Sequence, residues 1–293
     1  MSERRNVGPP ADRGRLERLV LSSVRIGLGL MWLVNVGWKV PPDFGESSGT
    51  GLFRFTRAAV EHQVFAPYAA LVRNLVLPNF RLFGWLVLIV EASLGAFLLL
   101  GWRTRIWAFI GVAQSVAIGL SVLNLDHEWP WSYYLMVLAH LAVFATAKPP
   151  AGGLDRALLT EPGRRRGGAV LAAVAVVGGL GGLIAALIDG GATNLGWGGV
   201  ELTLMRFNVA GALLILLIGT MAFAALLAER PRLLVAPAIM AAAGVVVTLV
   251  WWRRGETNVM GADGRTLSFE LMLAVGFGVL GTTSELKANS NAV

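Results

Sequence analysis

The chain has 293 residues, of which 55% are hydrophobic and only 15% are charged, whereas an average soluble domain has about 25% charged residues. Apolar runs of about 20 residues recur along its whole length, and each can cross a hydrocarbon core of roughly 30 Å. The net charge of +7 does not predict a nucleic-acid partner, because basic residues also set membrane topology and contact anionic lipids. We expect an all-α integral membrane protein embedded in the lipid bilayer.

Residues 1–17 carry mixed charges and are followed by no small-residue cleavage site, which predicts a short cytoplasmic tail rather than a cleaved signal peptide. Eight membrane spans are predicted, at residues 19–38, 83–101, 106–123, 131–148, 169–188, 208–227, 234–252 and 267–284. With the N-terminus inside, the inner segments hold 15 of the 25 Lys and Arg residues. The positive-inside rule therefore favours a cytoplasmic location for both termini.

The first outer loop, residues 40–82, is unusually long and alternates apolar and charged positions at helical spacing, with a break at Pro67. This pattern predicts one or two amphipathic helices over the outer mouth of the first four spans. A segment rich in Pro, Gly and Arg, residues 149–168, divides the chain. We expect a four-helix membrane domain over residues 18–160 and a second one over residues 161–293, where small residues allow close helix packing.

Polar residues occupy the centres of three successive spans: Glu91, Gln114 and His140. Arg25 lies roughly 5 Å from the centre of the first span. A charge at mid-bilayer costs about 2.5–3.5 kcal/mol, and the short side chain of Glu91 cannot reach either interface. We therefore expect Glu91 to face the bundle interior and to pair with Arg25, whose guanidinium can hold a carboxylate through two hydrogen bonds.

The last four spans contribute only Thr220 and Thr248 at comparable depth, and no ionisable group. On the first helix, Asn35 and Lys39 share the face of Arg25 and extend the polar stripe outward. Four residues are assigned to the outer mouth of the site: Asn35, Trp38, Lys39 and Trp131. Trp38 and Trp131 also belong to an expected aromatic belt at the membrane interface.

Each of these residues also has a purely structural interpretation. Arg25 alone could extend to the lipid headgroups, and a lone His140 is more often a core histidine satisfied by a neighbour. Gln114 alone could join two helices, Trp38 and Lys39 could be interface anchors, and Glu91 could belong to a structural salt bridge. The four groups together favour a site more strongly than any one of them does.

The polar layer suits several chemistries. Arg, His and Gln side chains can hydrogen-bond a quinone carbonyl, and Glu and His can move its protons. The same set could bind a small anion or form a proton path through a carrier. The absence of cysteine excludes disulfides, thiol relays and iron–sulfur clusters. The three histidines, His62, His127 and His140, have no paired spacing, so no metal site is predicted.

Three stretches resemble the DoxX-like membrane proteins, and most of all the DoxD subunit of thiosulfate:quinone oxidoreductase. They are "VRIGLGLMWLVNVGWK" (24–39), "FAPYAALVRNLVLPNFRLFGWLVLIVEASLGAFLLLGWRTR" (65–105) and "GGLDRALL" (152–159). The residues that carry the resemblance, within about residues 18–160, are Arg25, Gly27, Gly29, Gly37 to Lys39, Glu91, Gly101 to Arg105, and Gly153 to Asp155. The resemblance implies a four-helix bundle in a bacterial-type cell membrane and electron transfer from a reduced sulfur compound to quinone.

The leading hypothesis is therefore a quinone-linked oxidoreductase subunit that works with other membrane or periplasmic subunits. Arg25 and Glu91 would form its central pair, His140 and Gln114 would orient quinone, and Lys39 would attract an anionic donor. Two other classes stay open: a proton-coupled small-molecule carrier, and a non-catalytic scaffold or assembly subunit of a membrane complex.

Overall fold

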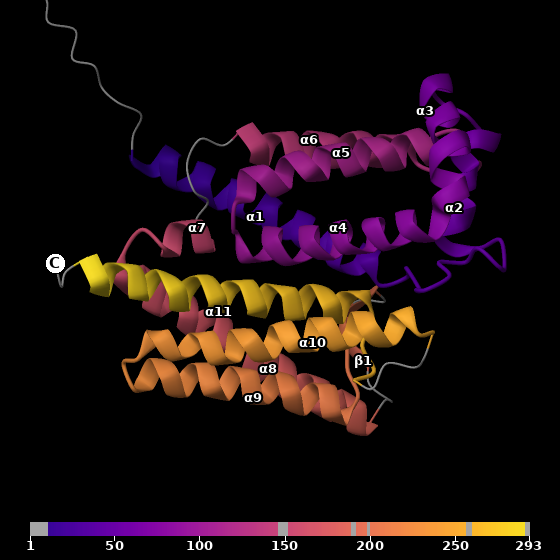
Figure 1. Cartoon of the computed structure of the whole chain (residues 1–293). Helices are drawn as coiled ribbons and strands as arrows, with labels where there is room; N and C mark the ends of the chain where they lie inside the picture. The colour runs from indigo at the N-terminus through magenta and orange to yellow at the C-terminus, as the bar shows by residue number, and fades with distance from the viewer. Residues whose placement is uncertain (1–10, 146–151, 189–191, 198–199, 256–259, 291–293) are drawn as a thin grey trace, which may run out of the picture.

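The computed structural model describes residues 11–145, 152–188, 192–197, 200–255 and 260–290. In this part of the chain, long helices run side by side along a common direction (Figure 1). They are α1 (Ala11–Val36), α4 (Phe80–Leu100), α5 (Thr104–Val122), α6 (Pro130–Ala145), α8 (Glu161–Ile188), α9 (Val209–Leu227), α10 (Val235–Arg253) and α11 (Gly264–Ser290). The short helical elements are α2 (Gly51–Glu61), α3 (Ala66–Leu71), η1 (Val72–Val76), η2 (Leu77–Asn79), α7 (Leu154–Ala157) and η3 (Pro231–Leu234).

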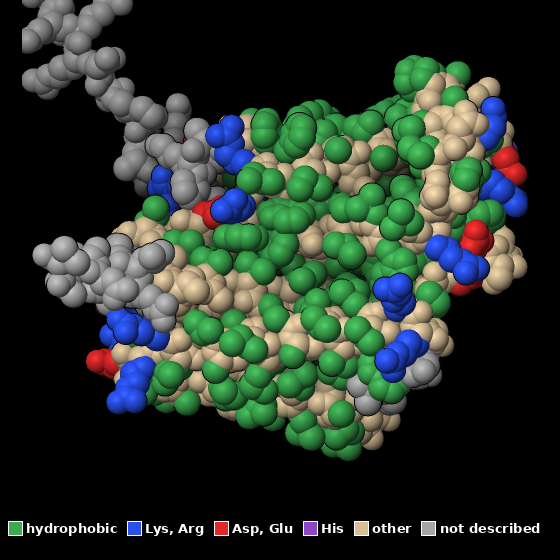
Figure 2. Space-filling model, in the orientation of Figure 1, with side chains coloured by type: hydrophobic (Ala, Val, Ile, Leu, Met, Phe, Trp, Pro, Cys, Tyr) green, Lys and Arg blue, Asp and Glu red, His purple; other side chains and the backbone are tan. Residues whose placement is uncertain are grey.

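Seven of the described helices are long and apolar enough to cross a membrane, and the 16-residue α6 is a shorter apolar helix. Each of the eight predicted spans falls on one of the long helices. Figure 2 shows hydrophobic side chains over the middle of the visible face, with Lys, Arg, Asp and Glu gathered toward its two ends. This distribution is typical of a lipid-facing surface. The prediction of a multi-pass α-helical membrane protein is confirmed.

The predicted tail and the first loop differ from the structure in extent. Residues 11–17 belong to α1 rather than to an unstructured tail, and residues 1–10 and 146–148 lie outside the described residues. Pro67 stands in the first turn of α3, where its missing N–H breaks no helical hydrogen bond. Helical structure therefore continues from Ala66 through η1 and η2 into α4.

The amphipathic segment of the first loop forms α2. This helix lies across one end of the first helix group, which consists of α1, α4, α5 and α6 (Figure 1). Its inward side is buried at Leu52, Thr56, Ala58 and Ala59. Its outward side carries an exposed ion pair between Arg57 and Glu61, at 2.9 Å. The chain between α1 and α2 packs inward as well, with the buried ring of Phe44 edge-on to Trp85 of α4.

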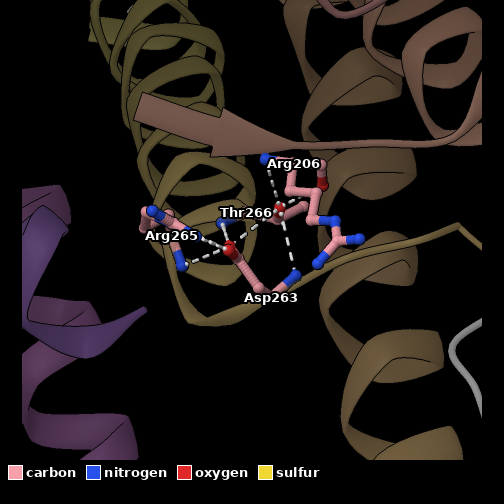
Figure 3. A network of polar contacts seen from close by, with 4 residues as sticks. All are labelled: Arg206, Asp263, Arg265 and Thr266. Carbon is pink, nitrogen blue, oxygen red and sulfur yellow. Dashed lines mark hydrogen bonds and ion pairs between the residues drawn. The ribbon is translucent and has the colours of Figure 1, made fainter. Parts of the chain in front are cut away.

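A β-hairpin that the sequence did not predict connects α8 to α9. Its strands, β1 (Ala192–Trp197) and β2 (Val200–Arg206), pair antiparallel. The end of β2 is tied to the start of α11 by the network in Figure 3. The Thr266 hydroxyl donates a hydrogen bond of 2.6 Å to the backbone carbonyl of Arg206.

The same network caps α11. The Asp263 carboxylate accepts hydrogen bonds from the backbone N–H groups of Arg265 and Thr266, at 2.9 and 3.2 Å. It also pairs with the guanidinium of Arg265, whose Nε lies 2.7 Å away (Figure 3). Two orphan N–H groups of the first turn are satisfied in this way, and this fixes where α11 begins.

Helices α8 and α9 pack closely, as the small residues of the second half predicted. A Cβ added at Gly179 would lie 2.6 Å from the backbone nitrogen of Leu216, and one at Gly219 would lie 2.7 Å from that of Val176. Only glycine allows the two backbones to approach this closely.

The two groups of helices share a core along α4 and α11. Ala96 and Phe97 of α4 belong to one buried cluster with Leu273 and Phe277 of α11. The start of α11 also meets the end of α1, because a Cβ added at Gly264 would overlap the carbonyl oxygen of Val36. Residues from both halves of the chain therefore surround the middle of α4.

Candidate functional site at the end of helix α1

Helix α1 runs antiparallel to α4 and ends beside its middle. A Cβ added at Gly29 would lie 2.9 Å from the backbone nitrogen of Leu99, and one at Gly95 would lie 3.2 Å from that of Leu33. Continuing this register places Val36, the last residue of α1, opposite the part of α4 that contains Glu91. Helix α1 thus ends at Val36, two residues before the end of the predicted span 19–38, and the residues that follow form a turn.

This turn delivers Lys39 to Glu91. Both side chains are buried, with 3% and 1% of their surface exposed. The Lys39 ammonium pairs with Oε2 of Glu91 and donates a 2.9 Å hydrogen bond to the backbone carbonyl of Asn35. Two amides complete the site: Gln114 Nε2 donates to Glu91 Oε1 at 3.1 Å, and Asn35 Nδ2 donates to Oε2 at 3.2 Å. Three N–H donors thus converge on one carboxylate, which compensates for its removal from water.

Trp38 covers the outward side of this cluster. Its indole N–H donates to Oδ1 of Asn35 at 3.1 Å, and its ring centroid lies 4.0 Å from the Lys39 nitrogen. The ring also contacts Phe55 of α2 edge-on, with centroids 5.6 Å apart. Trp38 is 40% exposed, whereas Lys39 beneath its ring is buried. The indole therefore separates the buried ion pair from the surface of the bundle.

The predicted pairing of Arg25 with Glu91 is wrong. Arg25 is buried where α4 ends, and its Nη1 donates to the carbonyls of Leu98 and Leu99, the latter at 2.8 Å. Seven residues separate Glu91 from Leu98, about 10 Å along the helix. Arg25 satisfies carbonyls that have no partner within α4, so its location explains why this charge is tolerated inside the protein.

Several residues of the DoxX-like pattern meet at this end of α4. Gly101 adopts a left-handed conformation with φ of 66°, which a residue with a Cβ rarely adopts. The Asp155 backbone N–H donates to the Gly101 carbonyl at 2.9 Å. The Asp155 carboxylate accepts from the backbone N–H groups of Arg103 and Thr104, at 2.8 and 3.1 Å. These residues therefore terminate α4 and start α5.

His140 lies about one helical turn from the Lys39–Glu91 cluster and has partners of its own. Its Nε2 accepts a 3.0 Å hydrogen bond from the indole of Trp32, and its Nδ1 lies 2.7 Å from the carbonyl of Met136. Since Trp32 can only donate and the carbonyl can only accept, the ring is neutral and carries its proton on Nδ1. Gly111 of α5 gives it space, because a Cβ there would overlap the ring. His140 is a fully buried core histidine with both nitrogens engaged.

Trp131 is not part of the cluster. It is 53% exposed at the start of α6 and contacts Trp129 edge-on, with centroids 5.5 Å apart. Of the residues assigned from the sequence, the structure brings together Asn35, Trp38, Lys39, Glu91 and Gln114. Arg25 and Trp131 lie away from this cluster, and His140 lies next to it without a hydrogen bond to Glu91.

One buried ionisable residue contradicts the expectation for the last four spans. Glu270 of α11 is completely buried, two residues after Ser268, whose hydroxyl faces Gly95 of α4. Helices α4 and α11 run in the same direction, because Gly276 meets Leu100 further along. Glu270 therefore lies about 9 Å beyond Glu91 along the bundle. The available signal was a carboxylate inside the predicted span 267–284, but its position three residues from the span boundary resembled that of an interfacial charge.

The described residues include no group of three or more His, Asp or Glu side chains that could hold a metal ion. The fold and the cluster define a multi-pass helical membrane protein with a buried Lys–Glu pair in its first helix group. No family model, curated protein or solved structure matches the chain.

Proposed function

We propose that the protein is a quinone-linked membrane oxidoreductase subunit that exchanges protons with quinone at the Lys39–Glu91 cluster. The observation that carries this proposal is a protonatable ion pair with two amide donors, kept away from water inside an apolar helix bundle. Ionisable groups inside membrane bundles are costly, and they mark proton relays and substrate pathways.

The donor set suits a quinone, because the carbonyl oxygens of a quinone accept hydrogen bonds. When bound, the quinone would serve as the electron acceptor. The Lys39 ammonium and the Gln114 amide would hold such a carbonyl. Lys39 carries a proton that it can release and regain, and the Glu91 carboxylate stabilises the charged ammonium between turnovers. Arg25 and His140 have no part in this proposal, because their hydrogen bonds are made elsewhere.

Access from the lipid is the second element of the proposal. Trp38 is the partly exposed layer over Lys39, so rotation of its indole would open the cluster to a lipid-soluble molecule. The DoxX-like resemblance suggests a reduced sulfur compound such as thiosulfate as electron donor. Because the chain has no cysteine, the sulfur chemistry would belong to another membrane or periplasmic subunit.

The test measures thiosulfate-dependent reduction of decylubiquinone in membranes that contain the protein and its co-purifying subunits. The double substitution Lys39→Gln with Glu91→Gln removes both protonatable groups without leaving an unpaired charge. It should lower turnover by about 100-fold, the size of a typical acid–base contribution. The control Glu61→Gln removes a carboxylate that is exposed on α2 and should leave turnover unchanged. Undiminished turnover in the double variant, with normal folding, would contradict the proposal.

A proton-coupled carrier is the second candidate function, favoured by the additional buried carboxyl group of Glu270. Proteoliposomes containing only this chain distinguish the two functions. Uptake of a small solute driven by a pH gradient, without any redox partner, would favour the carrier. Quinone retained by the gently extracted protein, detected by native mass spectrometry, would favour the oxidoreductase.

We also propose that both termini face the cytoplasm of a bacterial-type cell, because inner segments hold more of the Lys and Arg residues under this orientation. The cysteine-free chain allows a direct test with single substitutions at two exposed positions, Gln63→Cys and Leu159→Cys. A membrane-impermeant maleimide should label the first in intact cells and the second only after permeabilisation. The reverse labelling pattern would invert the topology.

A further inference from the structure

The carboxyl group of Glu270 has one engaged oxygen and one free oxygen. Oε2 lies 3.4 Å from the hydroxyl of Thr248 on α10. Among the described residues, Oε1 has no hydrogen-bond partner, although the side chain is completely buried. Oε1 faces Gly244, where an added Cβ would lie 3.0 Å away. A glycine on α10 thus leaves space for a carboxyl group in an apolar helix interface.

No cation on α10 or α11 compensates this carboxyl group within the described part of those helices. The only charged residue of α10 is Arg253, which is exposed at the end of the helix. It stands five residues after Thr248, which is about 140° around the helix. On α11, Arg265 precedes Glu270 by more than one turn and is paired with Asp263.

The charged groups on the other helices and strands packed against α11 are also engaged or remote. On α4, Glu91 is paired with Lys39, and on α1, Arg25 binds backbone carbonyls. On β2, Arg206 is exposed. The arginines of α8, residues 164–166, stand in its first turns, and Arg232 of η3 is exposed.

An ionised carboxylate in such surroundings is strongly disfavoured, because neither water nor a cation stabilises its charge. A protonated carboxyl group avoids this cost and gains an O–H donor for the Thr248 hydroxyl. We propose that Glu270 and Thr248 form a proton-binding site between α10 and α11, in which the carboxyl group is neutral.

This site is distinct from the Lys39–Glu91 cluster and does not depend on quinone chemistry. Glu91 keeps its charge through a lysine and two amides, whereas Glu270 has one hydroxyl. The helix that carries Glu270 also carries Ser268, whose buried hydroxyl lies against Gly95 of α4. Gly95 is one helical turn from Glu91. The second helix group thereby gains a protonatable centre of its own, on the helix that packs against the first group.

Dicyclohexylcarbodiimide tests the proposal on the full-length protein in lipid nanodiscs at neutral pH. This lipophilic reagent adds to protonated carboxyl groups, and rearrangement gives a stable N-acylurea with no leaving group. The peptide that contains Glu270 should carry the adduct, and Glu270→Gln should abolish it. Lys39→Gln with Glu91→Gln should leave this labelling unchanged, because neither residue contacts Glu270.

Two results would overturn the proposal. One is the absence of an adduct on Glu270 in the wild-type protein. The other is slower labelling when sodium chloride replaces choline chloride, which would identify a metal-cation site instead.

Infrared spectroscopy provides a measurement that does not depend on reagent access. A protonated carboxyl C=O band should be present in the wild-type spectrum at neutral pH and absent from that of Glu270→Gln. A Thr248→Val variant, which keeps the carboxyl group, should retain the band at a shifted frequency. A wild-type spectrum without it would contradict a neutral Glu270.

Discussion

The Lys39–Glu91 pair shows how a carboxylate persists in the middle of a membrane helix. Its charge is balanced by an ammonium and by two amide N–H groups, from residues on α1, on α5 and in the turn after α1. The sequence was sufficient to predict that Glu91 needs an inward partner. It did not identify the partner, because α1 was expected to continue through Trp38, which would have carried Lys39 toward the outer interface.

Removing only one member of this pair should be more damaging than removing both. Lys39→Met leaves a buried carboxylate without its cation and should destabilise the protein by about 3–5 kcal/mol. Lys39→Met combined with Glu91→Met replaces the pair by apolar side chains and should recover most of the loss. Thermal unfolding in detergent measures both variants. A double variant no more stable than Lys39→Met would contradict the expected recovery.

At the scale of helices, the turn between α4 and α5 explains why several residues of the DoxX-like pattern occur together. Arg25 binds the last carbonyls of α4, Gly101 turns the chain, and Asp155 binds the first N–H groups of α5. A helix end buried in protein must find such partners. Their contacts at the end of α4 and the start of α5 are those of helix termination.

The Asp155 cap can be tested by two substitutions of different severity. Asp155→Ala removes both acceptor oxygens from the start of α5 and should cost about 1–2 kcal/mol. Asp155→Asn keeps one carbonyl oxygen and should cost less. Melting temperatures in the same detergent compare the two variants with the wild type. An Asn variant less stable than the Ala variant would argue against capping as the role of this carboxylate.

For the whole molecule, the positions of the spans were predictable because apolar runs of membrane length leave few alternatives. The depth of individual residues was not, since the centre of an apolar run need not be the centre of the bundle. Arg25 appeared close to the middle of its run, yet α1 extends to Ala11 and places this residue at the end of α4. Glu270 appeared interfacial, yet the start of α11 is enclosed by α10, α1 and β2.

The hairpin of β1 and β2 was missed for a different reason. Its strands include one glycine, Gly196, and several polar residues between two strongly apolar spans, a composition that indicates a connector. Its attachment to Thr266 through the Arg206 carbonyl joins residues 60 positions apart. Contacts over such separations are not encoded in any local pattern.

The meeting of Gly264 with Val36, and of Gly37 with the guanidinium of Arg265, has a consequence for biosynthesis. The turn that carries Lys39 is translated well before the residues of α11 that pack against it. Insertion of α11 therefore completes the packing around a turn made more than two hundred codons earlier. A nascent chain that lacks α11 would leave the end of α1 and this turn without their contacts to Gly264 and Arg265.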